Sequence, residues 1–152
     1  MSRNFHNIVS FLESHDLKYD AIPDKSVILL NITGKQATYQ MLIKVEDGRH
    51  VQVFGVSPIS VPEGARSDIA VAIAAANYGL IIGKFELDMS DGEVRFHVAL
   101  PFDGELPGHD VLSRVVLTPI AMLDKYMPAF LAVIYGNEVP AEAVACVEAS
   151  GA

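Results

Sequence analysis

The segment from Asn77 to Pro101 reads NYGLIIGKFELDMSDGEVRFHVALP, and it decides the fold. Asn77 and Gly79 can end a helix, and two runs of alternating apolar residues follow them. The pair Asp91-Gly92 separates the two runs, and this dipeptide favours the tight turn of a β-hairpin. A helix that leads directly into a hairpin predicts one domain of mixed helix and antiparallel sheet.

The residues before this segment predict a helix, three strands and a second helix. Apolar residues near the N-terminus follow helical spacing and predict a helix from Asn4 to His15. Three apolar runs then predict strands at 26–32, 37–45 and 50–56, and the connections between them are too short for parallel crossovers. After a loop with prolines and a glycine, an alanine-rich segment predicts a helix from Ala65 to Asn77.

The residues after the hairpin predict a long helix and a tail. Apolar side chains keep helical spacing from Asp110 to Tyr135, but Pro119 and Pro128 lie within this run. Each proline removes a main-chain hydrogen bond and clashes with the preceding turn, so we expect kinks or breaks near both. Residues 137–152 form a C-terminal tail, either a short helix or a disordered end.

Together these elements predict an α+β fold in the order α-β-β-β-α-β-β-α. One antiparallel five-stranded sheet with flanking helices accounts for segregated helices and short strand connections. We assign residues 1–136 to a single domain, because a chain of 152 residues is long enough to bury one core.

Composition limits the classes of partner. The formal net charge is −8 and no cluster of lysine and arginine interrupts it, so nucleic acid and anionic lipid are poor candidates. No apolar run reaches the roughly 18 residues that span a bilayer, and no secretory signal is visible. Cys146 is the only cysteine, which excludes an internal disulfide. We therefore expect a cytoplasmic protein that binds neither nucleic acid nor membranes.

No sequence motif carries a recognisable chemistry. The five histidines include no close ligand pair, and His50 and His97 are at most neighbours on a polar strand face. Asp91 is explained by the hairpin turn, and Cys146 lies near glutamates rather than the basic groups that activate a thiol. We therefore predict no catalytic residue, no metal and no cofactor.

The order of elements and several short motifs resemble YbjN-domain proteins. The resemblance covers roughly residues 5–136 and lies in NYGL at 77–80, GKFELD at 83–88, DGEVRF at 91–96 and DKYMPAF at 124–130. It implies the fold of type III secretion chaperones, which are small, acidic, often dimeric proteins that bind other polypeptides. The family is described as bacterial sensory transduction regulators, and no catalytic residue belongs to its pattern.

Two surfaces are candidates for binding a protein partner. The alanine-rich helix is apolar around most of its circumference, which leaves burial within the monomer and contact with a second copy both open. Its candidate dimer or partner surface comprises Ile69, Val71, Ala72, Ile73 and Ala76. A candidate acidic face, which would steer a partly basic partner, comprises Glu86, Asp88, Asp91 and Glu93.

We therefore predict a non-enzymatic binding or regulatory protein that forms a homodimer and engages a polypeptide client. The alternative is a small-ligand or enzymatic domain with a pocket between the sheet and the C-terminal helix. The residues that would line this pocket are Tyr39, Phe85, Phe96 and Phe130. A solid aromatic core would argue against this alternative, whereas a buried polar cluster would favour it.

Overall fold

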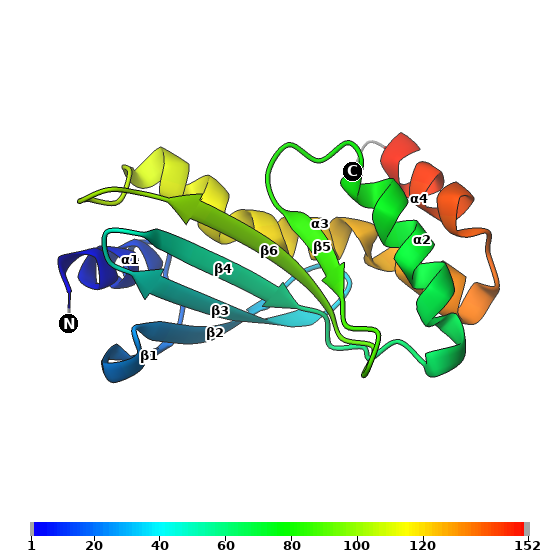
Figure 1. Cartoon of the computed structure of the whole chain (residues 1–152), viewed down its shortest axis with the longest axis horizontal. Coiled ribbons are helices and arrows are strands. Elements are labelled where there is room, and N and C mark those ends of the chain that lie inside the picture. The colour runs from blue at the N-terminus through cyan, green and yellow to red at the C-terminus, as the bar shows by residue number, and fades with distance from the viewer. Residues whose placement is uncertain (1, 151–152) are drawn as a thin grey trace.

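A computed structural model describes residues 2–150 and shows one twisted antiparallel sheet with four helices (Figure 1). The strands are β1 (Asp20–Ile22), β2 (Val27–Thr33), β3 (Thr38–Glu46), β4 (His50–Val56), β5 (Lys84–Leu87) and β6 (Val94–Pro101). The helices are α1 (Arg3–Ser14), α2 (Arg66–Asn77), α3 (His109–Gly136) and α4 (Pro140–Ala149). In Figure 1, α1 and α3 lie behind the sheet, and α2 and α4 lie together at one end.

The sheet confirms the predicted α+β class and corrects the number of strands. Its order is β1-β2-β3-β4-β6-β5, and every neighbouring pair is antiparallel. The structure has six strands rather than the predicted five, because β1 pairs Asp20 with Leu29 and Ile22 with Val27. Three residues are too few to display alternation, and the sequence pattern therefore missed this strand.

The long helix α3 runs unbroken through Pro119 and Pro128, so the breaks predicted at these prolines are wrong. Eleven residues of α3 are buried, and each large apolar side chain among them contributes about 1.5–3 kcal/mol. This total exceeds the cost of about 3 kcal/mol for each proline. By length and composition alone α3 could cross a membrane, but in this fold it is the central core helix.

Aromatic side chains fill the space between the sheet and α3. The Phe85 ring makes edge contacts with Phe96, Tyr126 and Phe130, with ring centroids 4.8, 5.4 and 5.2 Å apart. All of these rings are buried, and so is Tyr39. The pocket predicted between the sheet and the C-terminal helix, lined by Tyr39, Phe85, Phe96 and Phe130, is therefore occupied by the core itself.

Residues 140–149 of the predicted tail form α4, which packs against α2 and α3. Ala143 and Val144 are buried there, and the Tyr126 hydroxyl donates a hydrogen bond to Glu148 Oε2 at 2.8 Å. Burial, together with this bond, raises the pKa of Tyr126 to about 12. The helical alternative for the tail is the one observed, while residues 151 and 152, like residue 1, lie outside the described residues.

The buried amide of Asn4 ties α1 to two distant loops. Its Nδ2 donates to Asp47 Oδ1 at 3.0 Å and to the Gly104 carbonyl at 2.9 Å, and its Oδ1 accepts from the Leu106 amide at 3.1 Å. Three partners satisfy most of what one amide side chain can bind, so this buried polar residue costs little. Asn4 thereby fixes α1 against both the β3–β4 turn and the loop before α3.

Candidate functional site

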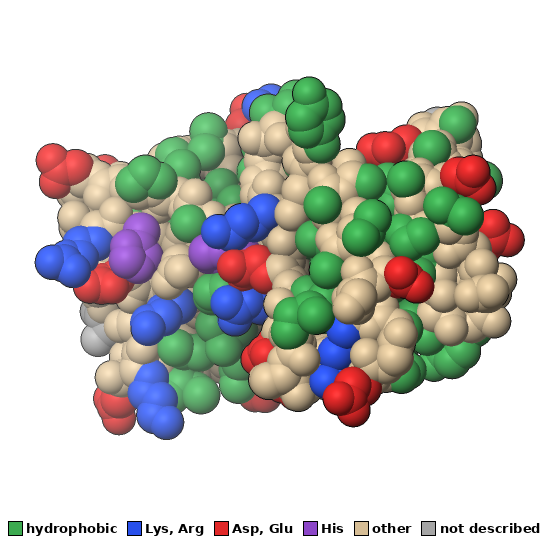
Figure 2. All heavy atoms as spheres, turned by 45° about the vertical axis from the view of Figure 1, so that its right-hand side comes forward, with side chains coloured by type: hydrophobic (Ala, Val, Ile, Leu, Met, Phe, Trp, Pro, Cys, Tyr) green, Lys and Arg blue, Asp and Glu red, His purple; other side chains and the backbone are tan. Residues whose placement is uncertain are grey.

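The sheet has one face without a helix layer within residues 2–150, and we call it the open face. Strand register places four half-buried side chains side by side across it, in the row Leu29, Leu42, Phe54 and His97. Val27, Gln52 and Val56 are half-buried neighbours on the same face. Figure 2 shows apolar side chains in the left half of the view, with basic, acidic and histidine side chains around them.

An aromatic and polar cluster occupies the middle of the open face. The His97 ring stacks on Phe54 with centroids 4.4 Å apart, and the Arg95 guanidinium lies 4.7 Å from the Phe54 ring centroid. Gln52 Nε2 and His97 Nε2 are 3.1 Å apart, within hydrogen-bond distance. Burial lowers the pKa of His97, with Glu86 opposing this shift, so the neutral ring is favoured near neutral pH. The cluster therefore combines stacked aromatic and neutral polar side chains with the positive charge of Arg95.

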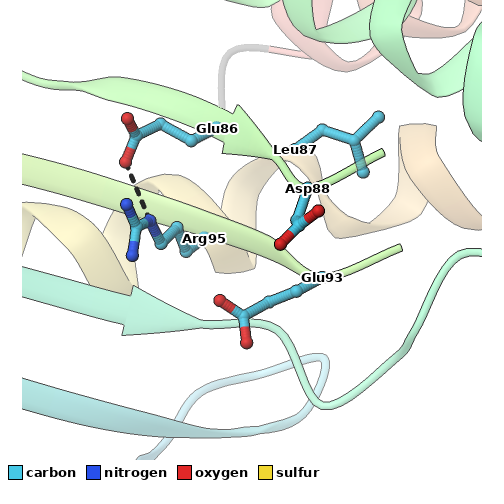
Figure 3. A pocket seen from close by; sticks show the side chains of 5 residues that line it. All are labelled: Glu86, Leu87, Asp88, Glu93 and Arg95. Atoms are coloured by element: carbon cyan, nitrogen blue, oxygen red, sulfur yellow. Dashed lines mark hydrogen bonds and ion pairs between the residues drawn. The ribbon is translucent and has the colours of Figure 1, made fainter. Parts of the chain in front are cut away.

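The predicted acidic face lies at the end of the β5–β6 hairpin (Figure 3). A hollow of about 210 Å³ is lined there by Glu86, Leu87, Asp88, Glu93 and Arg95. Glu86 Oε1 accepts a charge-assisted hydrogen bond from Arg95 Nε at 2.8 Å, and its other oxygen lies 3.8 Å from Lys84 Nζ. Arg95 and Lys84 therefore offset the negative charge of Glu86.

The aspartates of this hairpin hold its turn. Asp88 Oδ1 accepts from the hydroxyl and the amide of Ser90, at 2.6 and 2.9 Å, and these bonds lower the pKa of Asp88. Asp91 Oδ1 accepts from the Glu93 amide at 2.9 Å. Among the four predicted acidic residues, Glu93 is the one whose exposed side chain forms no ion pair or hydrogen bond within residues 2–150. The exposed carboxylates of Asp88, Asp91 and Glu93 therefore keep the hairpin turn acidic, and Glu93 is the one whose side chain is not used to hold the turn.

The predicted helix surface is mostly interior, which corrects that expectation. Ile69, Ala72, Ile73 and Ala76 are buried within the single chain, on the side of α2 that meets β5, α3 and α4. Val71 is the exception, with 53% of its surface exposed. These four residues cannot contact a second copy without opening the core, so burial within the monomer explains them.

A different apolar stripe lies on the outer side of α2. Val71, Ala74 and Tyr78 share this side by helical spacing, and Tyr78 is 95% exposed. Ile81, in the loop that follows, is 98% exposed. We call Val71, Ala74, Tyr78 and Ile81 the α2 stripe.

The last residue of α2 closes the edge of the sheet at β5. Asn77 Nδ2 donates to the Phe85 carbonyl at 3.1 Å, and Asn77 Oδ1 accepts from the Phe85 amide at 2.8 Å. The amide side chain therefore takes the place of a neighbouring strand at Phe85. The sequence identified Asn77 as a helix end, but it gave no sign of this second role.

A protein-family model matches most of the chain. The model of the YbjN family, described as "Putative bacterial sensory transduction regulator", matches residues 5–132. The chain belongs to the YbjN family. Among solved structures it is similar to YbjN from E. coli, described as "a putative transcription regulator", with a TM-score of 0.60 and 14% sequence identity. That alignment covers 93% of this chain and 91% of the other, and at this identity it shows the fold alone.

No curated protein sequence matches the chain. The resemblance to the YbjN family is thus confirmed, and the family description names a regulator rather than an enzyme. The matched residues end within α3, so α4 lies beyond the part of the chain that the YbjN model covers.

Within the YbjN match, Asp124 is the residue whose role sequence reasoning missed. Its carboxylate accepts hydrogen bonds from the Lys35 and Gln36 amides, both at 2.8 Å, and from the Tyr39 hydroxyl at 3.0 Å. Burial alone would raise the pKa of Asp124, but these three bonds outweigh it and the pKa is lowered. A Cβ at Gly34 would collide with the carboxylate at 2.5 Å. The sequence signal that could have identified this role is the position of Asp124, an acidic residue within an apolar helical run.

As the sequence allowed, His50 and His97 lie on the same face of the sheet, the open face. His50 lies 3.3 Å from Glu46 and His97 bonds to Gln52, whereas His15 and His109 meet with Nε2 atoms 3.2 Å apart. Among the residues that the structure describes, no group of three or more histidine, cysteine or acidic side chains is arranged to hold a metal ion.

Proposed function

We propose that this YbjN-family chain is a non-catalytic regulatory protein that binds a polypeptide on the open face of its sheet. The observation that supports this proposal is the half-buried row Leu29, Leu42, Phe54 and His97, which has no second layer within residues 2–150. A sheet face with apolar side chains normally packs against another layer. Burial of such area is worth about 25 cal/mol per Å², so a covering partner would stabilise the complex.

The charges around the row favour an apolar contact. Although the chain has a net charge of −8, two of the anions on this face, Glu46 and Glu86, each have a cation nearby. Asp20, opposite Leu29 at the β1 end of the row, is exposed and forms no ion pair within residues 2–150. Lys44 is exposed on the same face and forms no ion pair within residues 2–150. The open face is therefore closer to neutral than the chain as a whole, and it suits a polypeptide with apolar side chains and few charges.

The test is a pull-down in which one variant disables the open face and another serves as a matched control. Leu42→Glu places a charge in the row, whereas Val111→Glu places the same charge on the exposed side of α3. Proteins captured from native lysate by the wild type and by Val111→Glu, but not by Leu42→Glu, would support the proposal. Equal capture by all three chains would reject it, provided that circular dichroism shows Leu42→Glu to be folded.

We also propose that two copies associate through the α2 stripe, in place of the buried residues predicted earlier. The exposed side chains of Val71, Tyr78 and Ile81 support this, because large apolar side chains grouped on a surface favour association. Light scattering after size exclusion should give twice the chain mass for the wild type and the chain mass for Tyr78→Asp. A wild type that remains monomeric at high concentration would reject the dimer.

The charge of the chain and its single thiol bear on the partner and on the cell compartment. We propose that Glu93, with Asp91 beside it, steers a basic part of the partner, so that association should slow with added salt. The exposed thiol of Cys146 supports a reducing, cytoplasmic location. The net charge of −8 supports a partner other than nucleic acid or an anionic membrane.

A further inference from the structure

The edge of the sheet at β2 presents main-chain groups that point away from the protein. Hydrogen bonds from Val45 N to Ser26 O and from Gly34 N to Ala37 O, 3.0 and 2.8 Å long, fix the alternation along the β2–β3 pair. Even-numbered residues of β2 therefore bond to β3. The N–H and C=O groups of Asn31 and Thr33 consequently point to the opposite side, where β1 would lie if it were longer.

Strand β1 is too short to cover these groups. It pairs only with Val27 to Leu29, and at Tyr19 the chain has turned toward α1, where the Tyr19 hydroxyl bonds to Glu13 at 2.6 Å. The outward main-chain groups of Asn31 and Thr33 have no hydrogen-bond partner within residues 2–150, and both residues are exposed. Unpaired edge groups of this kind are a template for another strand.

A hollow lies where such a strand would begin. Its volume is about 330 Å³, and it is lined by Lys18, Tyr19, Asp20, Leu29, Leu30 and Asn31. It therefore spans the step at which β1 ends and the edge of β2 becomes free. We define the open edge as Leu30 to Thr33 together with this hollow.

The side chains along the open edge specify the chemistry of an added strand. Leu30 and Ile32 point to the helix side of the sheet, so an apolar residue of the incoming strand would lie beside them, while residues opposite Asn31 and Thr33 would point to the open face. Lys18 and Lys35 are exposed near the two ends of the open edge, and neither forms an ion pair within residues 2–150. Carboxylates at the ends of the incoming strand would complement them.

We propose that the open edge binds an extended segment of the partner polypeptide as an added strand. The segment has alternating apolar and polar residues and acidic residues at its ends. This proposal rests on the proposed function, because the same polypeptide would continue onto the open face. A second copy of the chain is a poorer occupant, since the open edge is only four residues long and a pairing of two such edges would bury little area.

The probe is the acetylated and amidated heptapeptide Asp-Thr-Val-Thr-Val-Thr-Asp, titrated into the isotopically labelled full chain. Four main-chain hydrogen bonds predict a dissociation constant on the order of 1 mM. On binding, the amide signals of Asn31 and Thr33 should shift, and their exchange with solvent should slow about tenfold. The same peptide with methyl groups on its edge-facing amide nitrogens should bind at least about tenfold more weakly.

Variants of the open edge complete the test. Asn31→Pro removes an outward N–H without removing a bond to β3. The variant should fold, because proline is tolerated at an edge strand, and the missing N–H should weaken peptide binding about tenfold. Asn31→Ala keeps the N–H and should bind like the wild type. Lys18→Glu and Lys35→Glu should each weaken binding of the acidic peptide severalfold. Neither change should affect binding of a peptide with asparagine at both ends.

Several results would overturn strand addition. Equal binding of the methylated and unmethylated peptides would do so, as would the absence of any shift at about 5 mM peptide. Shifts confined to Leu42 and Phe54 would reject the open edge while leaving the proposed binding at the open face intact. Amides of Asn31 and Thr33 that are already protected in a dimer without peptide would show that a second copy occupies the edge, contrary to the proposal.

Discussion

The two edges of the sheet end in opposite ways. At β5, the Asn77 side chain donates to and accepts from the main chain of Phe85, at 3.1 and 2.8 Å. At β2, the outward groups of Asn31 and Thr33 have no such partner within residues 2–150. One amide can satisfy both a donor and an acceptor, so Asn77 takes the place of a partner strand at Phe85, and α2 packs against the same edge. The comparison teaches that this fold blocks one edge with a helix and a side chain bonded at Phe85, and leaves the other able to pair.

The largest expected effect comes from freeing the turn that ends the open edge. In Asp124→Ala the Lys35 and Gln36 amides and the Tyr39 hydroxyl lose a charged acceptor. We expect the free energy of unfolding to fall by about 3 kcal/mol, because hydrogen bonds to charged groups contribute about 1.5–3 kcal/mol each. Urea denaturation followed by circular dichroism measures this change.

The matched control for Asp124→Ala is Asp110→Ala, which removes an exposed carboxylate from the first turn of the same helix. That change should cost no more than about 0.5 kcal/mol. If both variants lose the same stability, the Asp124 contacts with the β2–β3 turn do not hold the end of the open edge.

The next largest effect should come from opening the closed edge. Asn77→Ala leaves the Phe85 amide and carbonyl unpaired beside the aromatic core, and we expect a loss of about 2 kcal/mol. Asn7→Ala, an exposed position on α1, is the control and should be neutral or slightly stabilising. A stability loss below about 0.5 kcal/mol for Asn77→Ala would show that the amide does not stand in for a strand.

Acid should distinguish the two edges. Hydrogen bonds keep the pKa of Asp124 below its ordinary value of 3.8, despite burial. A carboxyl with a depressed pKa in the folded state stabilises the fold above pH 3.8, and this contribution is lost as the pH falls through the folded value. The Lys35 and Gln36 amides should therefore lose protection from hydrogen exchange below about pH 4, while the Asn77 contact contains no titrating group.

The same pH series with Asp124→Asn tests whether protonation of Asp124 causes the loss of amide protection. The variant has no carboxyl at this position, so the protection of the Lys35 and Gln36 amides should no longer change between pH 5 and pH 3 on account of residue 124. A pH dependence that is unchanged from the wild type would assign the effect to another group.

The smallest stability effect should be at the open edge itself. Asn31→Ala removes a side chain that forms no hydrogen bond within residues 2–150, and it should change the free energy of unfolding by less than about 0.5 kcal/mol. In the wild type, the Thr33 amide should exchange with solvent at least about a hundredfold faster than the Phe85 amide. Similar exchange rates at Thr33 and Phe85 would contradict the difference between the edges.

Sequence patterns predicted the class of fold because alternation and helical spacing are properties of whole segments. They predicted the β2-β3-β4 meander and the β5–β6 hairpin, because apolar and polar residues alternate over enough positions in these segments to be recognised. They missed β1, whose three residues pair only because β2 is already in place. They also expected breaks at Pro119 and Pro128, since local cost is visible in a sequence and the burial that offsets it is not.

The candidate site was less predictable, because it depends on which side of an element the fold leaves uncovered. The composition of α2 indicated an apolar helix all round, but only the tertiary packing decides that Ile69 is buried and Val71 exposed. The roles of Asn77 and Asp124 depend on partners at Phe85 and at Lys35, and the partner of Asp124 lies 89 positions away in the chain. No window of local sequence contains Asp124 with Lys35, and nothing in the eight positions from Asn77 to Phe85 signals that the two residues bond.

The anchoring of Asn4 has a consequence for synthesis on the ribosome. Its partners Asp47, Gly104 and Leu106 emerge after it, the last of them when about 100 further residues have been translated. Helix α1 is translated before these partners, so we expect it to be among the last elements of this fold to be fixed in place. Until then its apolar side, with Phe5, Ile8 and Leu12, stays available to chaperones, and slower translation prolongs that exposure.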